Sequence, residues 1–353
     1  MKFPIPVFAL LMLLFASCSK CGKPISPLNV EKNSVYFWKT VFRPDSTDIS
    51  FLKAHNIGRI YVRMFDVSYD SEAGLPDEKA YPNASVKFRE PEFSELCDSL
   101  PDMEFVPVVY ITLEALRAVH DHEDVLAANI VTRVRNMCEY NGVPSVREMQ
   151  LDCDWTSSTE SSFFSLCEAV RQTIAELELP WQLSSTIRLH QLSRQAPPVD
   201  RGVLMVYNTG NFNDPDALNS IISLDDVKPY MKHLPGYPLH LDVAYPTYSW
   251  QLLFRRRQFV GIIREINLTD TTKFVSKEPN LYEAVRDIPF NDRIIHKGDI
   301  IREETSSFQS IAEVKEMIEK RLSGHSNIIY HFDSDNLSKY SSDEIDYILS
   351  VAR

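Results

Sequence analysis

The amino-acid sequence predicts an α/β fold, a (β/α)8 TIM barrel with a small α+β insertion between strand 7 and strand 8. Eight short runs rich in β-branched and aromatic residues recur along the chain, and segments with helical spacing separate several of them. Strands that alternate with helices in this way are typical of a closed parallel barrel. The gap between the last two runs is too long for one helix, which indicates the insertion.

The expected strands are the most apolar short runs of the chain, such as RIYVRMFDV and EFVPVVYIT. Valine, isoleucine, tyrosine and phenylalanine dominate them, and these residues favour a pleated, half-buried backbone. In chain order, strands are expected at residues 34 to 42, 59 to 67, 104 to 112, 147 to 155, 181 to 189, 202 to 208, 238 to 245 and 327 to 333.

Helices are predicted where apolar residues recur every three or four positions. The clearest follows the fourth strand, where one face carries Phe163, Cys167, Val170, Ile174 and Leu177. The other helices are expected at residues 46 to 56, 124 to 140, 215 to 233, 310 to 322 and 342 to 351.

Residues 251–306 are predicted to form the inserted subdomain within a barrel domain that spans 34–353. Its segments FVGIIREI (259 to 266) and RIIHKGDIIREE (293 to 304) have the composition of strands. The second segment is expected to form a hairpin that turns at Lys297-Gly298.

The N-terminal segment has the pattern of a secretory signal. Lys2 precedes an apolar run too short to span a bilayer comfortably, and small residues follow it. Phe15-Ala16-Ser17-Cys18 resembles a bacterial lipobox, in which the cysteine is acylated and becomes the first residue of the mature protein. We therefore expect a signal peptide at 1–17, lipidation of Cys18 and a flexible tether at 18–33. An ordinary secretory signal with a chance cysteine is the alternative.

No later apolar run has bilayer length, so the folded domain is expected outside the cytoplasm, held to the membrane through the lipid anchor at Cys18. This describes an outer-membrane lipoprotein of a Gram-negative cell envelope, with the periplasmic and surface faces both open. The formal net charge of −12 argues against nucleic acid or an anionic membrane surface as a partner.

The cysteines and histidines give no metal or cofactor signature. The expected folded domain contains Cys97, Cys138, Cys153 and Cys167. Their spacing matches no zinc pattern, and buried free thiols are favoured over a disulfide, because three of the four fall in expected helices and a strand. No glycine-rich phosphate loop or nucleophile elbow is visible, so no cofactor and no metal is expected.

Two aspartates stand inside the apolar fourth-strand run VREMQLDCDWTSST. Side chains alternate along a strand, so Asp152, Asp154 and Thr156 share one face and Cys153 and Trp155 the other. The apolar face must pack against helices, so the acidic face points into the barrel, toward its C-terminal mouth. Two carboxylates about 7 Å apart repel by about 2 kcal/mol at an effective dielectric constant near 20. This cost favours a functional use, or a proton shared between them, over a pair that hydrogen bonds simply satisfy.

The segment LDCDWT resembles the fourth-strand signature D-x-x-D-x-D-x-E of glycoside hydrolase family 18, the chitinases and endo-β-N-acetylglucosaminidases. Asp152 and Asp154 stand on its second and third acids, Met149 on its first, and Thr156 on its catalytic glutamate. An α+β insertion after the seventh strand is also a feature of that family.

Three later motifs follow in the family's order. LMVYN resembles the sixth-strand M-x-Y-D, with Tyr207 kept and Asn208 in place of the aspartate. VAYPTYSW is similar to the seventh-strand G-x-P-x-Y-G-R, with Pro246 and Tyr248 kept, and IIYHFDSD resembles the last-strand W-x-x-D-x-D, with Tyr330 in the position of the tryptophan. The family's third-strand S-x-G-G is not visible in VVYITLEAL.

The resemblance implies a sugar-binding site that has lost its proton donor. In family 18 the glutamate protonates the leaving oxygen, while the neighbouring aspartate and the sixth-strand tyrosine hold the N-acetyl group that attacks the sugar carbon. A threonine hydroxyl is too weak an acid for this step, and loss of a general acid typically costs about 10²- to 10⁴-fold in rate. We expect an oligosaccharide or glycoprotein glycan as the partner, bound with weak or no hydrolysis. The expected site has Asp152, Asp154 and Tyr207 at the catalytic positions, and Asp66, Thr156, Asn208, Tyr245, Tyr248, Trp250 and Tyr330 as substrate-binding residues.

Two other interpretations stay open. One is a glycoside hydrolase whose general acid has moved, and the candidate acids are Glu160, Asp66, Asp242 and the pair of Asp152 and Asp154. Glu160 is also explained as a first-turn helix carboxylate, and Asp66 and Asp242 as salt-bridge partners of Arg63 or Arg188. The other interpretation is a structural or interaction lipoprotein of the envelope whose cleft takes a protein partner.

Overall fold

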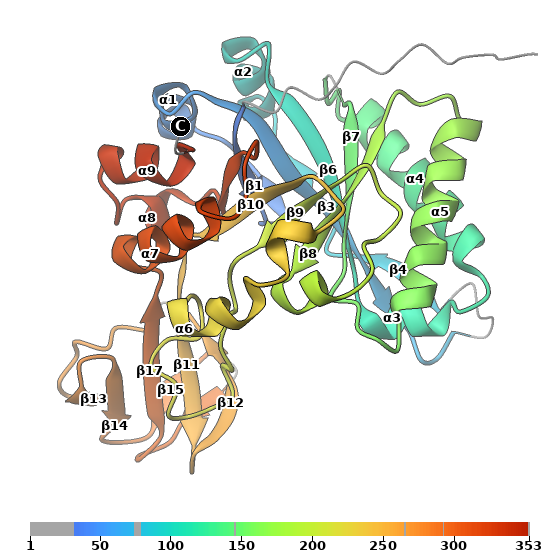
Figure 1. Cartoon of the computed structure of the whole chain (residues 1–353). Helices are drawn as coiled ribbons and strands as arrows, with labels where there is room; N and C mark the ends of the chain where they lie inside the picture. Colours follow the sequence, from blue (N-terminus) through green and yellow to red (C-terminus); the bar gives the residue numbers. More distant parts are fainter. Residues whose placement is uncertain (1–31, 74–78, 145, 265, 292, 352–353) are drawn as a thin grey trace, which may run out of the picture.

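The computed structural model describes residues 32–73, 79–144, 146–264, 266–291 and 293–351. Its main sheet is a barrel of eight parallel strands in the order β1-β18-β10-β9-β8-β7-β6-β3, and β1 also pairs with β3, which closes it (Figure 1). The predicted (β/α)8 barrel is thereby confirmed. The expected signal peptide, the lipidation site and most of the tether lie outside the described residues.

All eight expected strand runs contain a strand of the barrel. The barrel strands are β1 (Asn33–Phe37), β3 (Ile57–Tyr69), β6 (Glu104–Ile111), β7 (Glu148–Asp152), β8 (Gln182–Arg188), β9 (Arg201–Met205), β10 (Leu241–Pro246) and β18 (Asn327–Tyr330). β4 (Ala80–Asn83) adds an antiparallel strand to the end of β3, and β2 (Val41–Phe42) pairs with β5 (Lys87–Phe88) outside the barrel. The expected first strand therefore ends early, at Phe37.

Helices surround the barrel, and α4 and α5 lie side by side on one flank (Figure 1). The helices are α1 (Ser46–Ala54), α2 (Glu92–Ser99), α3 (Leu113–Ala118), α4 (Glu123–Tyr140), α5 (Glu160–Glu176), α6 (Leu224–Val227), α7 (Phe308–Glu319), α8 (Ser334–Leu337) and α9 (Ser342–Leu349), with short 3-10 turns at Leu189–Ser193, Lys228–Tyr230 and Leu234–Gly236. Several begin at a side chain that accepts a first-turn amide, as Asp45 does for α1 and Ser341 for α9.

The apolar core has two layers that follow from strand alternation. The larger layer lies between the strands and the helices, and in it Leu151, Cys153 and Trp155 pack with Phe163 of α5. The smaller layer fills the barrel interior with Tyr36, Tyr61, Val106, Val108, Val203, Met205, Ala244 and Ile328. The predicted outward face of the fourth strand is confirmed.

The helix expected at residues 215 to 233 is wrong. This stretch holds only the four residues of α6 and one 3-10 turn, Lys228–Tyr230. Pro229 has no N–H for a helical hydrogen bond. Ser220 bonds to the inserted sheet instead, because both its amide and its hydroxyl donate to the Glu304 carboxylate, at 2.8 and 2.6 Å. Contacts to the inserted sheet thus replace a regular helix.

The insertion between β10 and β18 consists of strands in its described residues, so the predicted helical part is wrong. They are β11 (Ser249–Arg255), β12 (Gln258–Ile263), β13 (Phe274–Glu278), β14 (Leu281–Ala284), β15 (Ile288–Phe290), β16 (Arg293–Ile295) and β17 (Ile300–Thr305). Five of them form an antiparallel sheet in the order β12-β11-β17-β14-β13, beside the barrel (Figure 1). This sheet has its own apolar core, which includes Leu253, Phe274 and Ile301.

The expected hairpin across Lys297-Gly298 is also wrong. The two strands flanking this turn do not pair with each other, because β16 pairs with β15 while β17 pairs with β11 and β14. Asp299, just after the turn, accepts two hydrogen bonds from Arg255 of β11, at 3.0 Å from Nε and 2.8 Å from Nη2. This ion pair anchors β17 to β11.

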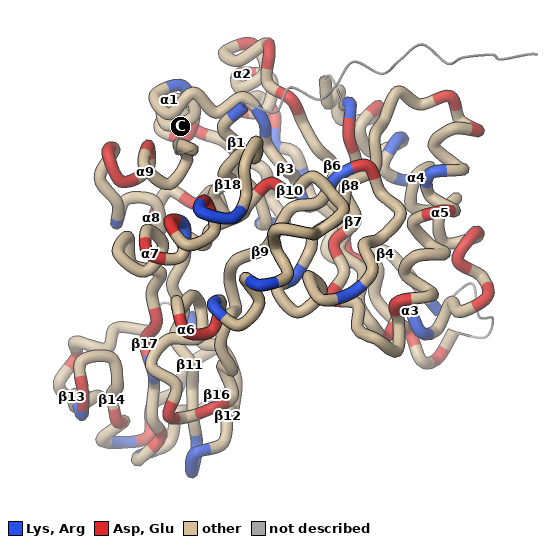
Figure 2. The backbone as a smooth tube through the Cα atoms, viewed as in Figure 1, with Lys and Arg blue, Asp and Glu red and all other residues tan. Residues whose placement is uncertain are grey.

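Acidic residues are dispersed over the described chain, and most of its cysteines are buried. Within the described chain, acidic residues are spread over α3, α5 and α9 rather than gathered on one face (Figure 2). Cys138, Cys153 and Cys167 are buried free thiols as predicted, whereas Cys97 is only partly buried. Among the residues that the structure describes, none of the helices combines the length and apolar character of a membrane span.

Candidate functional site

The C-terminal ends of the barrel strands bring most of the predicted site residues together. Asp152 ends β7 and Tyr330 ends β18, while Tyr207 follows β9 by two residues and Tyr248 precedes β11. All strands of the barrel are parallel, so these positions share one rim. That rim is the end at which barrels of this kind carry their active sites.

Arg188, the last residue of β8, links the two aspartates of the fourth strand. Its Nη2 lies 2.9 Å from Asp152 Oδ1, and its Nε donates to Asp154 Oδ1. Thr186, two residues earlier on the same strand, donates to Asp152 Oδ1 at 2.6 Å. Arg188 pairs with both aspartates, but its one positive charge offsets only one of their two negative charges. Both acids have hydrogen-bond partners, as the alternative interpretation expected, and the proton shared between them stays a prediction.

The two aspartates sit in different environments. The side chain of Asp152 is 2% exposed and that of Asp154 is 48% exposed, since β7 ends between them. Burial raises the pKa of Asp152 above its usual value, the Arg188 charge opposes this shift, and Asp154 adds to it. Tyr110 on β6 faces the same group, and burial together with Asp154 and Asp152 raises its pKa to about 12. Asp154 is therefore the carboxylate that meets solvent at the mouth.

Aromatic rings cover the rest of the mouth. Tyr207 and Tyr330 stack with their ring centroids 4.2 Å apart and an interplanar angle of 19°. Tyr248 meets both edge-on, at 6.2 and 6.0 Å, and Trp250 continues the row at 5.7 Å from Tyr248. Trp38, which follows β1, lies 5.7 Å from Tyr330 on the other side. All five rings are half-buried, so each keeps an edge or face at the surface.

Polar contacts hold this aromatic row in place. Asn208 has a left-handed backbone with φ of 51°, a conformation that asparagine tolerates well, and its Oδ1 accepts the Tyr248 hydroxyl at 2.6 Å. Trp250 Nε1 donates to Glu304 at 2.7 Å. Burial and the neighbouring Tyr330 raise the pKa of Tyr207 well above its usual value, so its hydroxyl stays protonated.

Asp66 lies at the rim, in ion pair with Arg63. Arg63 Nε donates to Asp66 Oδ1 at 2.6 Å, and its guanidinium carbon lies 5.5 Å from the centroid of Trp38. Asp66 is in register with Tyr110, which is in register with Asp152 on the next strand. Asp66 therefore adjoins the site, with its carboxylate occupied by Arg63.

Thr156 lies just past the end of β7, in the turn that leads to α5. Its hydroxyl lies 3.0 Å from that of Ser158, and its amide donates to Thr159 Oγ1 at 3.0 Å. Glu160 begins α5 and its carboxylate lies 3.6 Å from Arg194. Strand alternation no longer governs Thr156, because the strand stops at Asp152.

Two of the predicted positions lie away from the mouth. Tyr245 is wholly buried in the layer between barrel and helices, since it alternates with the inward residue Ala244 on β10, so its assignment as a substrate-binding residue is wrong. Asp242 is the second residue of β10, at the opposite end of the barrel, where it pairs with Arg201 rather than Arg188 and accepts the Ser326 amide at 2.9 Å. It cannot act on a ligand at the mouth.

Three residues of the mouth were not predicted from the sequence. Trp38, Tyr110 and Arg188 interact with predicted site residues, although none belongs to a motif used above. Tyr110 and Arg188 lie within two residues of the end of an expected strand, whereas Trp38 lies in the middle of one, because β1 ends earlier than expected. A polar or aromatic residue at the C-terminal end of a barrel strand is a site candidate on topology alone.

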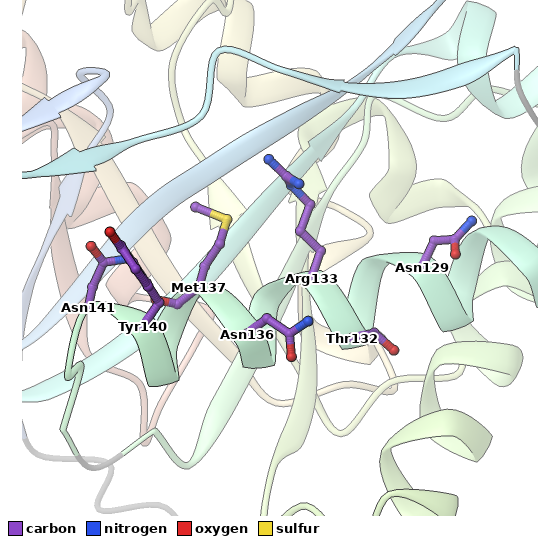
Figure 3. Close-up of a pocket in the computed structure, with 7 residues that line it drawn as sticks. All are labelled: Asn129, Thr132, Arg133, Asn136, Met137, Tyr140 and Asn141. Atoms are coloured by element: carbon purple, nitrogen blue, oxygen red, sulfur yellow. The ribbon is translucent and has the colours of Figure 1, made fainter.

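A separate hollow of about 320 Å³ runs along the outer ring (Figure 3). Its described lining comes from one stripe of α4 and the residue after it, namely Asn129, Thr132, Arg133, Asn136, Met137, Tyr140 and Asn141. Tyr140 is 90% exposed there. The hollow shares none of these residues with the barrel mouth.

Comparison with known proteins finds the likeness in structure alone. No family model and no curated protein matches the sequence. A glycoside hydrolase family 18 N-acetylglucosaminidase from Paenibacillus barengoltzii aligns with a TM-score of 0.51 and 11% identity, over 90% of this chain and 100% of that one. A family 18 chitinase from Cycas revoluta in complex with (GlcNAc)4 gives 0.50 and 11%, over 90% and 98%. A Group II chitinase catalytic domain from Ostrinia furnacalis gives 0.51 and 9%, over 90% and 95%.

The fold is a divergent glycoside hydrolase family 18-like barrel. At these identities the likeness establishes the architecture, and the residues of the mouth decide the chemistry. Asp152 and Asp154 stand where the fourth-strand signature has acids, and Thr156 stands where it has its glutamate.

Proposed function

We propose that this protein is an envelope lipoprotein that binds glycans, with N-acetylhexosamine units, in the mouth of its barrel and hydrolyses them weakly or not at all. The observation that carries the proposal is the row of half-buried aromatic rings beside an exposed carboxylate, with threonine in the position of the general acid. Solved barrels of similar fold include a chitinase in complex with (GlcNAc)4, which supports this class of ligand.

The chemistry of the mouth suits a neutral sugar. The C–H faces of a pyranose pack on aromatic rings, and Tyr248, Trp250 and Trp38 offer such surfaces on either side of the stacked tyrosines. Asp154, half exposed, can accept a hydroxyl or amide hydrogen through the carboxylate oxygen that Arg188 leaves free. The 4.2 Å separation of Tyr207 and Tyr330 leaves no room for a sugar between them, so they act as one platform.

The candidates for a relocated acid fit hydrolysis poorly. A general acid must carry its proton near neutral pH, whereas Asp66 is paired with Arg63 and Glu160 lies near Arg194. Asp242 is at the far end of the barrel. Asp152 has a raised pKa, but its side chain is 2% exposed and out of reach of a glycosidic oxygen. Hydrolysis with a moved acid is the alternative that the following experiment separates.

Asp154→Ala and Tyr207→Phe are each expected to weaken binding of N-acetylglucosamine oligosaccharides by about tenfold, because each removes a hydrogen-bonding group worth about 1–2 kcal/mol. Calorimetry gives the affinity, and mass spectrometry of the incubated glycans detects cleavage. Asp216→Asn, at a side chain 69% exposed on another part of the surface, is the matched control and should bind as the wild type does.

The outcomes separate the three interpretations. Wild-type cleavage that Asp154→Ala abolishes would establish a hydrolase with a relocated acid. Binding without cleavage supports the proposed function. Failure of the wild type to bind any of the N-acetylglucosamine oligosaccharides would favour an interaction protein of the envelope instead.

Attachment to the envelope is tested separately at Cys18. Cys18→Ser removes the sulfur that the lipobox-like sequence offers for acylation, so we expect the protein to move from the membrane fraction to the soluble fraction. Fractionation with mass spectrometry of the N-terminal peptide checks this. An unchanged distribution of the variant would contradict lipidation at this residue.

A further inference from the structure

Arg188, at the end of β8, contacts side chains at the ends of both neighbouring strands, β7 and β9. One guanidinium donates to Asp154 from Nε and lies 2.9 Å from Asp152 through Nη2. Its central carbon also lies 5.9 Å from the centroid of the Tyr207 ring. The side chain is only 15% exposed, so water screens these contacts weakly. Arg188 thus fixes the carboxylate that the proposed function places against the ligand.

Arg188 would also affect the protonation of any acid introduced at position 156. A general acid must stay protonated near neutral pH, and a neighbouring free carboxylate helps it to do so by raising its pKa. A neighbouring guanidinium has the opposite effect, since it favours the ionised form. Asp154 stands two residues before Thr156 and is paired with Arg188. The carbonyl of Trp155, between them, accepts Gln191 Nε2 at 2.9 Å, and Gln191 Oε1 accepts the Arg188 amide at 2.8 Å, so the segment that carries position 156 is held against the end of β8. The carboxylate that would keep such an acid protonated is therefore already paired with a cation.

We propose that Arg188 is a positioning residue which, independently of Thr156, holds this barrel in a binding state, so that restoring a carboxylic acid at position 156 does not by itself restore glycoside hydrolysis. The inference rests on the proposed function, because it assumes that glycans bind in this mouth. In this proposal, Thr156 and Arg188 each keep the barrel from hydrolysing a bound glycan.

The titratable groups that act on this pair come from several strands. They are Tyr36 on β1, Tyr110 on β6, Cys153 just after β7, Arg188 on β8, Tyr207 after β9 and Tyr330 on β18. Of these, Arg188 is the cation, and the tyrosines have raised pKa values and stay neutral. Removal of Arg188 therefore changes the charge of the mouth by one unit without creating another pair.

The test measures hydrolysis of chitotetraose to shorter oligosaccharides by the full chain in detergent, because a sugar leaving group needs a proton from a general acid. In this reaction the glycosidic C–O bond breaks, the introduced acid gives its proton to the leaving oxygen, and water supplies the hydroxyl of the new reducing end. The variants are Thr156→Glu, Arg188→Gln, their combination, and Thr156→Gln with Arg188→Gln as the matched control that lacks the acid.

We expect Thr156→Glu alone to stay within a few fold of the wild type, and the combination with Arg188→Gln to exceed it by about 10²-fold in kcat, the range typical of general-acid catalysis. The pH profile supplies a readout that a merely structural role for Arg188 would not move. Activity of the combined variant should persist to higher pH than the residual activity of Thr156→Glu, because loss of the guanidinium raises the pKa of the introduced acid.

Two results would overturn the inference. One is full activity of Thr156→Glu with Arg188 in place, and the other is a combined variant that is folded and binds glycan yet cleaves no faster than Thr156→Glu. If Arg188→Gln fails to fold, Arg188→Lys keeps a charge but can pair with one carboxylate only, and it should give an intermediate rate with Thr156→Glu. Calorimetry of the wild type is independent of these rates. A wild type that binds no glycan would contradict the proposed function, whereas the rates of the variants test the role of Arg188.

Discussion

Replacing Arg201 by methionine is expected to lower the free energy of unfolding by about 3–5 kcal/mol, the range found when one partner of a buried ion pair is removed. Arg201 and Asp242 pair at the end of the barrel opposite the mouth, with side chains 5% and 1% exposed. Methionine fills a similar volume, so the loss comes mainly from Asp242, which stays buried beside the Ser326 amide and the more distant His240 without its cation. Urea denaturation at neutral pH measures the change.

The exposed pair of Arg257 and Asp216 is the matched control. Both side chains are 69% exposed, and pairs of this kind are worth about 0–1 kcal/mol, so Arg257→Met should leave the unfolding midpoint almost unchanged. Equal effects of Arg257→Met and Arg201→Met would show that the buried pair has no special role.

The buried pair also predicts the direction of the acid response. Burial alone raises the pKa of Asp242, but the hydrogen bond from His240 and the charge of Arg201 outweigh it and leave the pKa below its usual value. A lowered folded-state pKa means that the contribution is present above the unfolded-state pKa, about 4, and is lost as the pH falls through the lower folded value. Arg201→Met raises the pKa of Asp242, so its unfolding should depend less on pH in this range.

The barrel was predictable because its evidence is local and repeated. Each barrel strand is recognisable from its own residue composition. The alternation of Leu151, Asp152 and Cys153 correctly separates the inward face of the fourth strand from its outward face. The same reasoning failed where pairing is set by distant residues. The stretch from 215 to 233 is held by Glu304, and β17 is held to β11 through Asp299, and neither contact is visible from the neighbouring sequence.

The sequence predicted which residues lie at the site, but it did not predict which of their charges pair with one another. Motif positions placed Asp154, Tyr207 and Tyr330 at one rim, as the structure has them. Tyr245 failed because membership in a motif overrode the strand alternation that sends it outward. Arg188 was considered as a partner for Asp66 or Asp242, yet it pairs with Asp152 and Asp154. The choice among several buried acids depends on which strands are neighbours, and β7 and β8 are neighbours.

Tyr330→Ala is expected to weaken glycan binding by about 30-fold, because an aromatic anchor at the centre of a binding site is typically worth about 2 kcal/mol, and each 1.4 kcal/mol is tenfold in affinity. Tyr330 is that centre, since its ring touches the rings of Trp38, Tyr207 and Tyr248. Its loss removes one ring of the proposed sugar-binding surface and leaves Tyr207 without its stacking partner. Calorimetry with a chito-oligosaccharide measures the effect.

Tyr330→Phe distinguishes the ring from the hydroxyl. The phenylalanine keeps the stack with Tyr207, so its affinity should remain within about threefold of the wild type if the ring face is the binding element. Tyr140→Ala removes an exposed ring on α4 and should change nothing. Equal losses of affinity for the alanine and phenylalanine variants would instead place the hydroxyl in contact with the ligand. An unchanged affinity in both variants would mean that the glycan does not bind at this rim. Melting temperatures decide whether a loss of affinity reflects the site or the fold, because a half-buried ring also contributes to stability.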